Sequence, residues 1–442
     1  MKKKLLCALL ALSMLFVLAA CNGAPAENPG NNDAQTSGDT NTPGGAQTPD
    51  DTQAPADNGE SQSEPEPAAP DDQAGLSGET EPEPAAPVEG AFKLGGTGPL
   101  TGGAAIYGNA AKNGAQIAAD EINAAGGAVK FELRYEDDAH DAEKAVNAYN
   151  ALKDWGMQIS LGSVTSKPAE ATSAESFADG IFSLTPSASS PATIAGKDNV
   201  FQMCFSDPNQ GTASAQYIGM QNLAKSVAVI WKSDDVYSKG IRDTFLEEAD
   251  AQGLDIVSDT TFSDGNATDF SVQLNDAKNN GAELVFLPMY YEPASLILAQ
   301  ASAMGYAPKW FGVDGMDGIL TMQGFDASLA EGVMLLTPFN ADATDDATAK
   351  FVAEYQRRFG ETPNQFAADG YDCVYAYKQA LEAANATPDM GAAALNDLMK
   401  AQFTSMTFRG LTGDEMTWDA SGAVSKLPKG MVIQNGAYVG MD

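Results

Sequence analysis

Small hydroxyl side chains, tyrosines and one carboxylate recur at one kind of position in this chain, the loops that follow its apolar, strand-like segments. Hydroxyls and helix N-terminal amides donate hydrogen bonds to a carboxylate. An aspartate pairs with an ammonium, and tyrosines form apolar walls with a polar edge. The set therefore suits a zwitterion with an apolar side chain. These loops are residues 98–108, 162–166, 185–191, 232–237, 289–291 and Asp314.

The same inventory argues against catalysis. The single histidine, His140, stands in an acidic stretch where we expect it to be exposed, so a nucleophile–histidine arrangement has no good candidate. Gly96-Thr97-Gly98 only partly resembles a dinucleotide loop, because Thr101 replaces the third glycine and Pro99 intervenes. No Gly-Lys-Ser or Gly-Lys-Thr phosphate loop is present. We predict a protein without catalytic residues, cofactor or metal.

The N-terminus carries an export signal. Three lysines at residues 2–4 precede an apolar run that ends in Leu18-Ala19-Ala20-Cys21. A basic start, a short apolar run and small residues are typical of a secretory signal peptide. With Cys21 after them, they resemble the lipobox of bacterial lipoproteins, in which cleavage exposes a cysteine that is then lipidated. We predict a signal peptide at residues 1–20 and lipidation at Cys21; an ordinary signal with an incidental cysteine is the alternative.

Residues 21–90 have the composition of a disordered tether. From residue 22 to residue 90 there is no lysine, arginine or aromatic residue, and there are 15 acidic residues. Such a segment cannot bury enough apolar surface to offset the entropy of ordering it. Its Pro-Glu-Pro repeats favour extended chain. It is either a spacer that holds a domain away from the membrane or a solubilising tail.

The net charge and the length of residues 91–442 limit the partners and the fold of this part of the chain. The net charge of the chain is −35, of which about −23 falls on residues 91–442. An acidic domain repels nucleic acid and anionic lipid, so we expect no nucleic-acid partner. Residues 91–442 are more numerous than one hydrophobic core usually organises, which suggests two lobes. Their two cysteines, Cys204 and Cys373, favour two buried thiols over a disulfide, and they are too few for a metal cluster.

Strand-like and helix-like segments alternate from residue 92 onward, in two successive sets. Alternation of this kind predicts parallel sheets covered by helices. The expected strands are residues 92–98, 129–135, 159–161, 181–184, 227–231, 254–262, 284–288, a segment near Trp310, 333–336, a segment near Phe408 and 431–434. The expected helices are residues 106–124, 141–154, 168–178, 240–252, 270–278, 294–304, 349–359, 367–384 and 392–403.

The expected fold class is α/β, with two doubly wound parallel-sheet lobes joined by a three-crossing hinge. We assign residues 91–205 and 341–406 to the first lobe and residues 206–340 and 407–442 to the second. The crossings are expected near residues 203–207, 337–340 and 407–412. In doubly wound sheets ligands bind beyond the carboxyl ends of the strands. The loops named above would therefore meet in one cleft.

Several motifs resemble branched-chain amino acid binding proteins, the extracellular receptors of ABC importers with the type I periplasmic binding protein fold. The likeness begins at residues 98–102 (Gly-Pro-Leu-Thr-Gly) and continues through Tyr107-Gly108, residues 113–115 and residues 120–127. Residues 187–191 resemble the serine and threonine loop of the family. Residues 206–218 resemble its first crossover, and residues 234–240 resemble its second tyrosine loop. The likeness extends from about residue 92 to the end.

The resemblance implies roles by position. At the ligand carboxylate, Ser166 would donate through its hydroxyl and amide. At the ammonium, Ser187 would offer its carbonyl, Ser189 its hydroxyl and Asp314 its carboxylate. Three tyrosines would enclose the ligand side chain: Tyr107, Tyr237 and Tyr290.

Two departures from the family bear on the ligand. Lys167 stands where the family often has a small hydroxyl residue, and Asp314 is shorter than the usual glutamate. Leucine, isoleucine and valine are the expected ligands, with other amino acids, amides and small organic acids as alternatives.

The resemblance also implies a clamp. Ligand would bind one lobe first and be enclosed by closure of the other, and an ABC permease would recognise the closed form. The protein would act as a monomer, anchored by lipid at the outer face of the cytoplasmic membrane. A module that reports the ligand to a receptor is the alternative.

Overall fold

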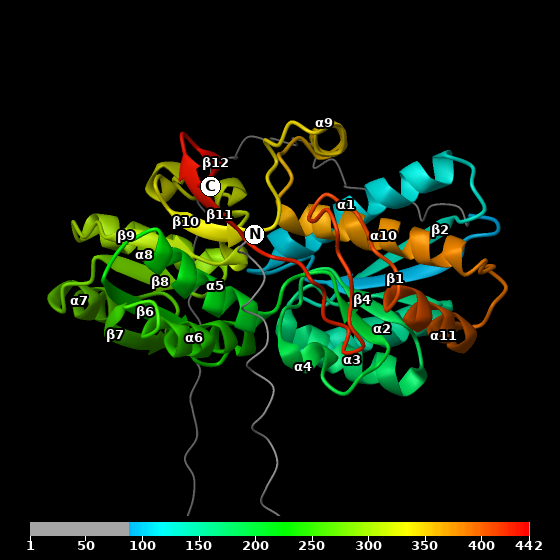
Figure 1. Cartoon of the computed structure of the whole chain (residues 1–442), viewed down its shortest axis with the longest axis horizontal. Coiled ribbons are helices and arrows are strands. Elements are labelled where there is room, and N and C mark those ends of the chain that lie inside the picture. The colour runs from blue at the N-terminus through cyan, green and yellow to red at the C-terminus, as the bar shows by residue number, and fades with distance from the viewer. Residues whose placement is uncertain (1–87, 442) are drawn as a thin grey trace, which may run out of the picture. The chain divides into compact units, whose positions relative to one another are not determined.

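Two sheets organise the part of the chain that the structure describes, residues 88–441 of a computed structural model (Figure 1). The signal peptide, Cys21 and nearly all of the expected tether lie outside the described residues, so those expectations stay predictions.

The first sheet consists of five parallel strands in the order β2-β1-β3-β4-β5. Strand β1, which lies between β2 and β3, is buried along almost its whole length, since only Lys93 is partly exposed. The strands are β1 (Phe92–Gly98), β2 (Phe131–Asp137), β3 (Ile159–Leu161), β4 (Ser183–Thr185) and β5 (Val200–Gln202).

Local sequence explains how the helices of the first lobe begin and end. In α2, the Asp141 carboxylate accepts the Lys144 N–H at 2.9 Å, and Gly156 takes the left-handed conformation after the last turn. The α1 helix buries a stripe of alanine and isoleucine. The helices are α1 (Ala105–Ala124), α2 (Ala142–Trp155), α3 (Ser166–Asp179), α4 (Pro191–Ile194), α10 (Gln365–Ala383) and α11 (Ala392–Phe403).

The second sheet has seven strands in the order β12-β11-β10-β9-β8-β6-β7. The strands from β6 to β10 are parallel, and an antiparallel hairpin at the end of the chain extends that sheet at one edge. They are β6 (Ser226–Lys232), β7 (Asp255–Phe262), β8 (Leu284–Leu287), β9 (Lys309–Gly312), β10 (Met334–Thr337), β11 (Lys429–Gln434) and β12 (Ala437–Gly440).

Four helices cover the second sheet, and a fifth, α9, packs on the first lobe. Lys350 and Arg358 of α9 form ion pairs with Glu121 and Asp120 of α1. The five are α5 (Asp207–Met220), α6 (Val236–Ala249), α7 (Ser271–Asn279), α8 (Tyr291–Ala303) and α9 (Asp346–Phe359). A 3₁₀ turn, Asp314–Met316, follows β9.

Both sheets share one doubly wound strand order, because β7-β6-β8-β9-β10 repeats the order of β2-β1-β3-β4-β5. In such a sheet the strand order reverses beside the first strand, and ligands bind beyond the carboxyl ends there. The switch points lie between β1 and β3 and between β6 and β8. The expected α/β architecture with two doubly wound lobes is confirmed.

The last passage of the chain between the lobes differs from expectation at one boundary. Residues 407–442 were assigned to the second lobe, but Phe408, Met416, Trp418 and Val424 belong to the buried cluster of the first lobe. In addition, the Gln202 N–H donates to the Gly422 carbonyl at 2.9 Å, beside the edge strand β5. The chain therefore enters the second sheet only with β11. Long loops with isolated bridges carry no strand periodicity, which hid this attachment.

The sequence also missed β5 and α5. β5 has only three residues, too few for a period to show. α5 is rich in glycine, alanine and serine, so its buried face carries little hydrophobic contrast. Both elements flank the first crossing between the lobes, residues 203–206.

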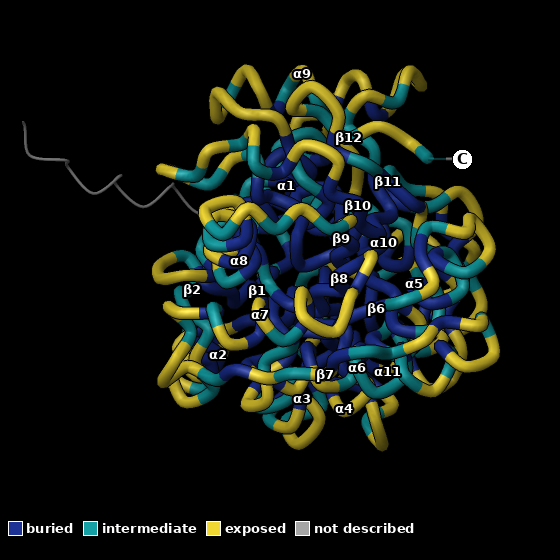
Figure 2. The backbone as a smooth tube through the Cα atoms, turned by 90° about the vertical axis from the view of Figure 1, so that its left-hand side faces the viewer, coloured by how far each residue is buried: buried dark blue, intermediate teal, exposed yellow. Residues whose placement is uncertain are grey.

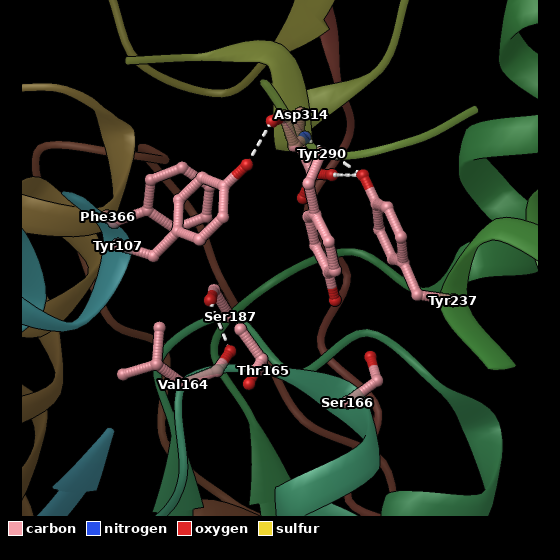
Figure 3. Close-up of a pocket in the computed structure, with 10 residues that line it drawn as sticks. Tyr107, Val164, Thr165, Ser166, Ser187, Tyr237, Tyr290, Asp314 and Phe366 are labelled. Carbon is pink, nitrogen blue, oxygen red and sulfur yellow. Dashed lines mark hydrogen bonds between the residues drawn. The ribbon is translucent and has the colours of Figure 1, made fainter. Parts of the chain in front are cut away.

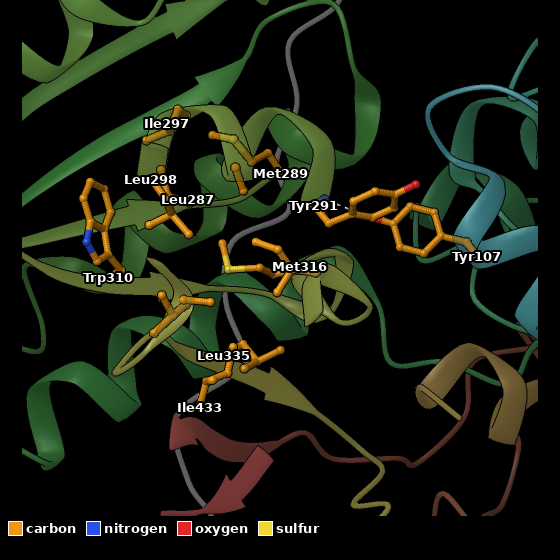
Figure 4. Packing of buried hydrophobic residues seen from close by; sticks show 14 of the residues in the cluster. Tyr107, Leu287, Met289, Tyr291, Ile297, Leu298, Trp310, Met316, Leu335 and Ile433 are labelled. Carbon is orange, nitrogen blue, oxygen red and sulfur yellow. Dashed lines mark hydrogen bonds between the residues drawn. The ribbon is translucent and has the colours of Figure 1, made fainter. Parts of the chain in front are cut away.

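Most inner strands of both sheets, such as β3, β8 and β10, lie in the buried interior, under more exposed helices and loops (Figure 2). The main cluster of the second lobe continues into the first. In Figure 4, Tyr107 of α1 lies beside Tyr291 of α8, at the edge of a cluster that includes Leu287, Met316 and Leu335. The two lobes are therefore in direct contact at this point.

No helix among residues 88–441 is long and apolar enough to cross a membrane. The same residues contain no group of three or more metal-binding side chains. Cys204 and Cys373 are free and buried, as expected.

One buried acid predicts how stability depends on pH. Asp138, directly after β2, is fully buried, and its carboxylate accepts the His140 N–H at 2.9 Å. Burial raises the pKa of Asp138 to about 7. The folded state therefore binds more protons than the unfolded state between about pH 4 and pH 7, so stability falls as pH rises through that window.

We expect Asp138 itself to lower the free energy of unfolding across this window by at most about 1.4 kcal/mol per pH unit, so the slope of the parent should be more negative than that of a variant without this carboxyl. Urea unfolding between pH 4.5 and 7.5 measures the slope. The control is Asp138→Asn, which cannot titrate and should flatten it. Equal slopes in the two proteins would contradict the prediction.

Candidate functional site

A cavity lies where the carboxyl ends of both sheets face each other (Figure 3). About 10 Å³ of free space remains between the side chains, roughly the room of one water molecule. This is below the roughly 300 Å³ at which small-molecule pockets usually begin. The lining residues are Tyr107, Val164, Thr165, Ser166, Ser187, Tyr237, Tyr290, Asp314, Gly315 and Phe366.

Asp314 is the acidic group of the cavity. It stands just after β9, and its carboxylate accepts a hydrogen bond from the Tyr237 hydroxyl at 2.6 Å. The side chain is 3% exposed. Burial raises the pKa of Asp314 to about 7, while Tyr237 and Gln210 favour its charged form. An ammonium in the cavity would supply the positive charge that this carboxylate lacks.

Backbone contacts from both lobes hold the loop that carries Asp314. The Tyr107 hydroxyl, from the first lobe, donates to the Gly315 carbonyl and accepts the Tyr291 N–H at 3.0 Å. The Gln365 amide, at the start of α10, donates to the Asp314 carbonyl at 3.2 Å. These contacts fix the carboxylate in place and also tie the lobes together.

Aromatic rings form two walls of the cavity. Tyr237 and Tyr290 stack at 4.7 Å with an angle of 4° between their planes. Opposite them, Tyr107 and Phe366 meet edge to face at 4.5 Å. Figure 3 shows these two pairs on either side of the cavity. Such walls suit an apolar side chain.

The first lobe supplies hydrogen-bond donors at the floor of the cavity. Ser166 is the first residue of the 14-residue helix α3, whose preceding residue, Thr165, makes no side-chain cap. The first amides of the helix therefore remain available to an anion. The Ser166 hydroxyl accepts the Ser190 N–H at 3.2 Å, and the Ser187 hydroxyl donates to the Val164 carbonyl at 2.7 Å.

Of the seven residues expected at the site, six line this cavity and one does not. Ser189 is not among the lining residues, and its hydroxyl is buried beside the Asp207 carboxylate, whose charged form it favours. Of the residues that were missed, Thr165 and Val164 fall within a loop already singled out at residues 162–166. Phe366 was not predicted, because it lies at the start of a helix that does not directly follow a strand. The six residues brought together are Tyr107, Ser166, Ser187, Tyr237, Tyr290 and Asp314.

His140 is not exposed, as the sequence led us to expect, but half-buried beside the cavity. Its ring stands perpendicular to Tyr290 at 5.5 Å, and Nδ1 lies 2.9 Å from the Thr165 hydroxyl. Burial lowers the pKa of His140 to about 4, with Lys232 and Lys167 adding to the effect. The acidic sequence around it did not reveal that the loop folds inward.

Two lobes that close on a polar cavity with aromatic walls define a solute-binding protein of the clamshell type. A periplasmic binding protein profile matches residues 91–433. The chain belongs to the periplasmic binding protein family, which confirms the resemblance seen in the sequence. Proteins of this family bind solutes and are not enzymes.

Relatives and solved structures agree with this assignment. The Leu/Ile/Val-binding protein BraC3 of Rhizobium johnstonii is 30% identical over 67% of this chain and 80% of its own length. The branched-chain amino acid transporter substrate-binding protein LivJ of Streptococcus pneumoniae, solved with isoleucine, is 27% identical, with a TM-score of 0.71. That match covers 79% of this chain and 97% of LivJ.

A more distant structure shares the fold alone. It is an ABC transporter solute-binding protein from R. palustris in complex with benzoate, 19% identical with a TM-score of 0.70. It covers 80% of this chain and 96% of its own.

Proposed function

We propose that this protein is the substrate-binding component of an ABC importer and that it carries an amino acid, a branched-chain one first, between its two lobes. One observation carries the proposal. The buried carboxylate of Asp314, from the second lobe, faces a cavity whose floor is the uncapped start of α3 in the first lobe. The two ends of the cavity thus have the chemistry of an ammonium partner and of a carboxylate partner.

The proposed orientation follows from these ends. The ligand ammonium lies at Asp314, with the Ser187 carbonyl as a further partner. Its carboxylate accepts from the Ser166 hydroxyl and the first amides of α3. Its side chain lies among the rings of Tyr107, Tyr290 and Phe366. The space between these groups is too small for an amino acid, so the lobes must part to admit the ligand.

Transport then follows from closure. Ligand shifts the lobes toward the closed form only as far as it binds that form more tightly. The permease recognises the closed form of the protein. The names of BraC3 and LivJ, both concerned with branched-chain amino acids, support this ligand class. We further propose that the protein is monomeric and works outside the cytoplasmic membrane, tethered through Cys21.

A thermal-shift screen against the common amino acids tests the ligand. We expect leucine, isoleucine or valine to raise the melting temperature most, because a ligand that binds only the folded state stabilises it. A shift with none of the amino acids would contradict the proposal. Loss of uptake in a deletion strain then supports transport, whereas unchanged uptake would favour a sensor.

Ser166→Ala tests the carboxylate end. It should weaken leucine binding by about 1–3 kcal/mol, because it removes one donor to a charged group while the amides of α3 remain. Isothermal titration calorimetry measures the change. Ser173→Ala, on the same helix but outside the cavity lining, is the control and should bind like the parent. Equal affinity of all three proteins would place the carboxylate elsewhere.

Cys21→Ser tests the anchor. The parent should incorporate labelled palmitate and fractionate with membranes, because the new N-terminal cysteine is the expected site of lipidation. The variant lacks the thiol and should be unlabelled. Equal labelling of the two proteins would refute lipidation at Cys21.

A further inference from the structure

The only histidine of the chain, His140, lies where the two lobes meet, and the proposed function does not use it. It follows β2 in the first lobe, yet its ring stands perpendicular to that of Tyr290 in the second lobe, with 5.5 Å between their centres. Its Nδ1 lies 2.9 Å from the Thr165 hydroxyl, directly before α3. Thr165 and Tyr290 both line the cavity. His140 therefore contacts one wall of the cavity in each lobe, and parting of the lobes would separate its ring from Tyr290.

An unusual backbone turn directs His140 inward. Ala139 and His140 both take the left-handed conformation, with φ values of 46° and 59°. Side chains other than glycine rarely adopt this conformation, and it persists where the surroundings hold it, often at functional sites. Two carboxylates hold it here. Asp137 accepts the Ala139 N–H at 2.8 Å, and Asp138 accepts the His140 N–H at 2.9 Å. The loop is thus fixed in a strained form that points the imidazole toward the other lobe.

Charged groups from both lobes surround the imidazole. The two lysines oppose a positive charge on the ring more strongly than Asp264 and Asp141 favour it. Asp138 is largely protonated at acidic pH, because burial raises its pKa to about 7. The titratable and charged groups beside the ring are Asp138 and Asp141 from its own loop, Lys167 from α3, Lys232 from the end of β6, Asp264 from the turn after β7, and the Tyr290 hydroxyl.

The second lobe supplies much of this environment. Lys232 is held by an ion pair with Asp264 at 2.5 Å, and both belong to that lobe together with Tyr290. With the lobes in contact, burial lowers the pKa of His140 to about 4. With the lobes apart, Tyr290 and Lys232 withdraw and water reaches the ring, and a histidine in water titrates near pH 6.5. Closure between about pH 4 and pH 6.5 therefore releases a proton, so the closed form becomes less favourable as pH falls through that window.

We propose that His140 is a closure switch: the neutral imidazole completes the contact between the lobes, and the protonated imidazole opens the clamp and releases the amino acid in acidic surroundings. This inference rests on the proposed function and adds a form of regulation to the same site. Asp314 has a separate effect of the same sign, because its protonation would remove the negative charge expected to pair with the ligand ammonium. The test must therefore distinguish His140 from Asp314.

Proton NMR follows His140 directly in protein purified without a histidine tag, because the chain has no other histidine. Without ligand the imidazole should titrate near pH 6.5, and with saturating leucine it should titrate below about pH 5. This measurement needs no variant. The same titration midpoint with and without leucine would overturn the inference while leaving the proposed function intact. Failure of leucine and the other amino acids to bind at pH 7.5 would overturn the proposed function, and the inference with it.

The variant His140→Asn separates the imidazole from Asp314. Asparagine tolerates the left-handed backbone but does not titrate, so the variant keeps only the effect of Asp314. Between pH 7.5 and pH 5, calorimetry should show the dissociation constant for leucine rising about tenfold more in the parent than in His140→Asn. Asp138→Asn is the matched control, because it keeps the imidazole and an acceptor for the His140 N–H, and it should follow the parent.

Parallel pH profiles of the parent and His140→Asn would overturn the inference. Equal loss of pH dependence in His140→Asn and Asp138→Asn would also overturn it, because the effect would then belong to the fold of the loop rather than to the imidazole.

Discussion

Replacing Asp314 with alanine is expected to weaken leucine binding by roughly 30-fold to several-thousand-fold, or about 2–5 kcal/mol. The reason is that the ligand ammonium would be enclosed in a closed cleft without its carboxylate. Removing one member of a buried charge pair leaves the other desolvated and unpaired. The variant also frees the Tyr237 hydroxyl, which now donates to Asp314 at 2.6 Å.

Calorimetry on purified parent and variant measures this loss. Asp250→Ala, an exposed acid on the same lobe, is the matched control and should bind like the parent. The melting temperature of Asp314→Ala without ligand is measured alongside, because the substitution also removes a buried hydrogen-bond partner of Tyr237. A dissociation constant within a factor of three of the parent's would contradict the assignment of Asp314 to the ligand ammonium.

The second large effect concerns stability. Lys426→Ala should lower the free energy of unfolding by about 3–5 kcal/mol, since it breaks a fully buried ion pair. Lys426 Nζ lies 2.7 Å from Asp369 of α10 and donates to the Thr412 hydroxyl at 2.6 Å. Both charged side chains are 1% exposed. The pair attaches the last passage between the lobes to α10.

Thr412 extends this buried group. Its N–H and hydroxyl donate to the Asp372 carboxylate, at 2.9 and 2.6 Å. Burial raises the pKa of Asp369 to about 6 even beside Lys426. In the variant this carboxyl should therefore take up a proton, and the destabilisation should be smaller at pH 5 than at pH 8.

Urea unfolding followed by circular dichroism measures the loss. The control is Lys378→Ala, which removes an exposed partner of Glu382, 2.8 Å away on the same helix. Surface pairs contribute about 0–1 kcal/mol, so this variant should be nearly as stable as the parent. Equal, small effects of the two substitutions would show that the buried pair does not hold the segment.

Periodicity predicted most of the fold. Buried strands such as residues 227–231 and the long helix beginning near residue 106 are dense in apolar residues at one spacing. Elements without a clear pattern of apolar residues were not predicted, notably the three-residue β5 and the small-residue helix α5. The attachment of residues 408–424 to the first lobe was not predicted either. It depends on backbone hydrogen bonds and on scattered aromatic residues rather than on a regular spacing of apolar residues.

The site was predictable to the extent that it follows the strand ends. Tyr237, Tyr290 and Asp314 all come directly after strands of one sheet, so topology alone brings them together. Phe366 lines the cavity and Gln365 holds the Asp314 loop, both from the start of α10, 50 or more residues further along the chain, and no local pattern marks them.

The position of a bound amino acid tests the central claim most directly. A crystal structure of the protein with leucine should show the ligand between the lobes. Its ammonium should lie within about 3 Å of the Asp314 carboxylate, and its carboxylate should lie against Ser166 and the first amides of α3. Leucine bound outside this cleft, or bound with its carboxylate toward Asp314, would contradict the account.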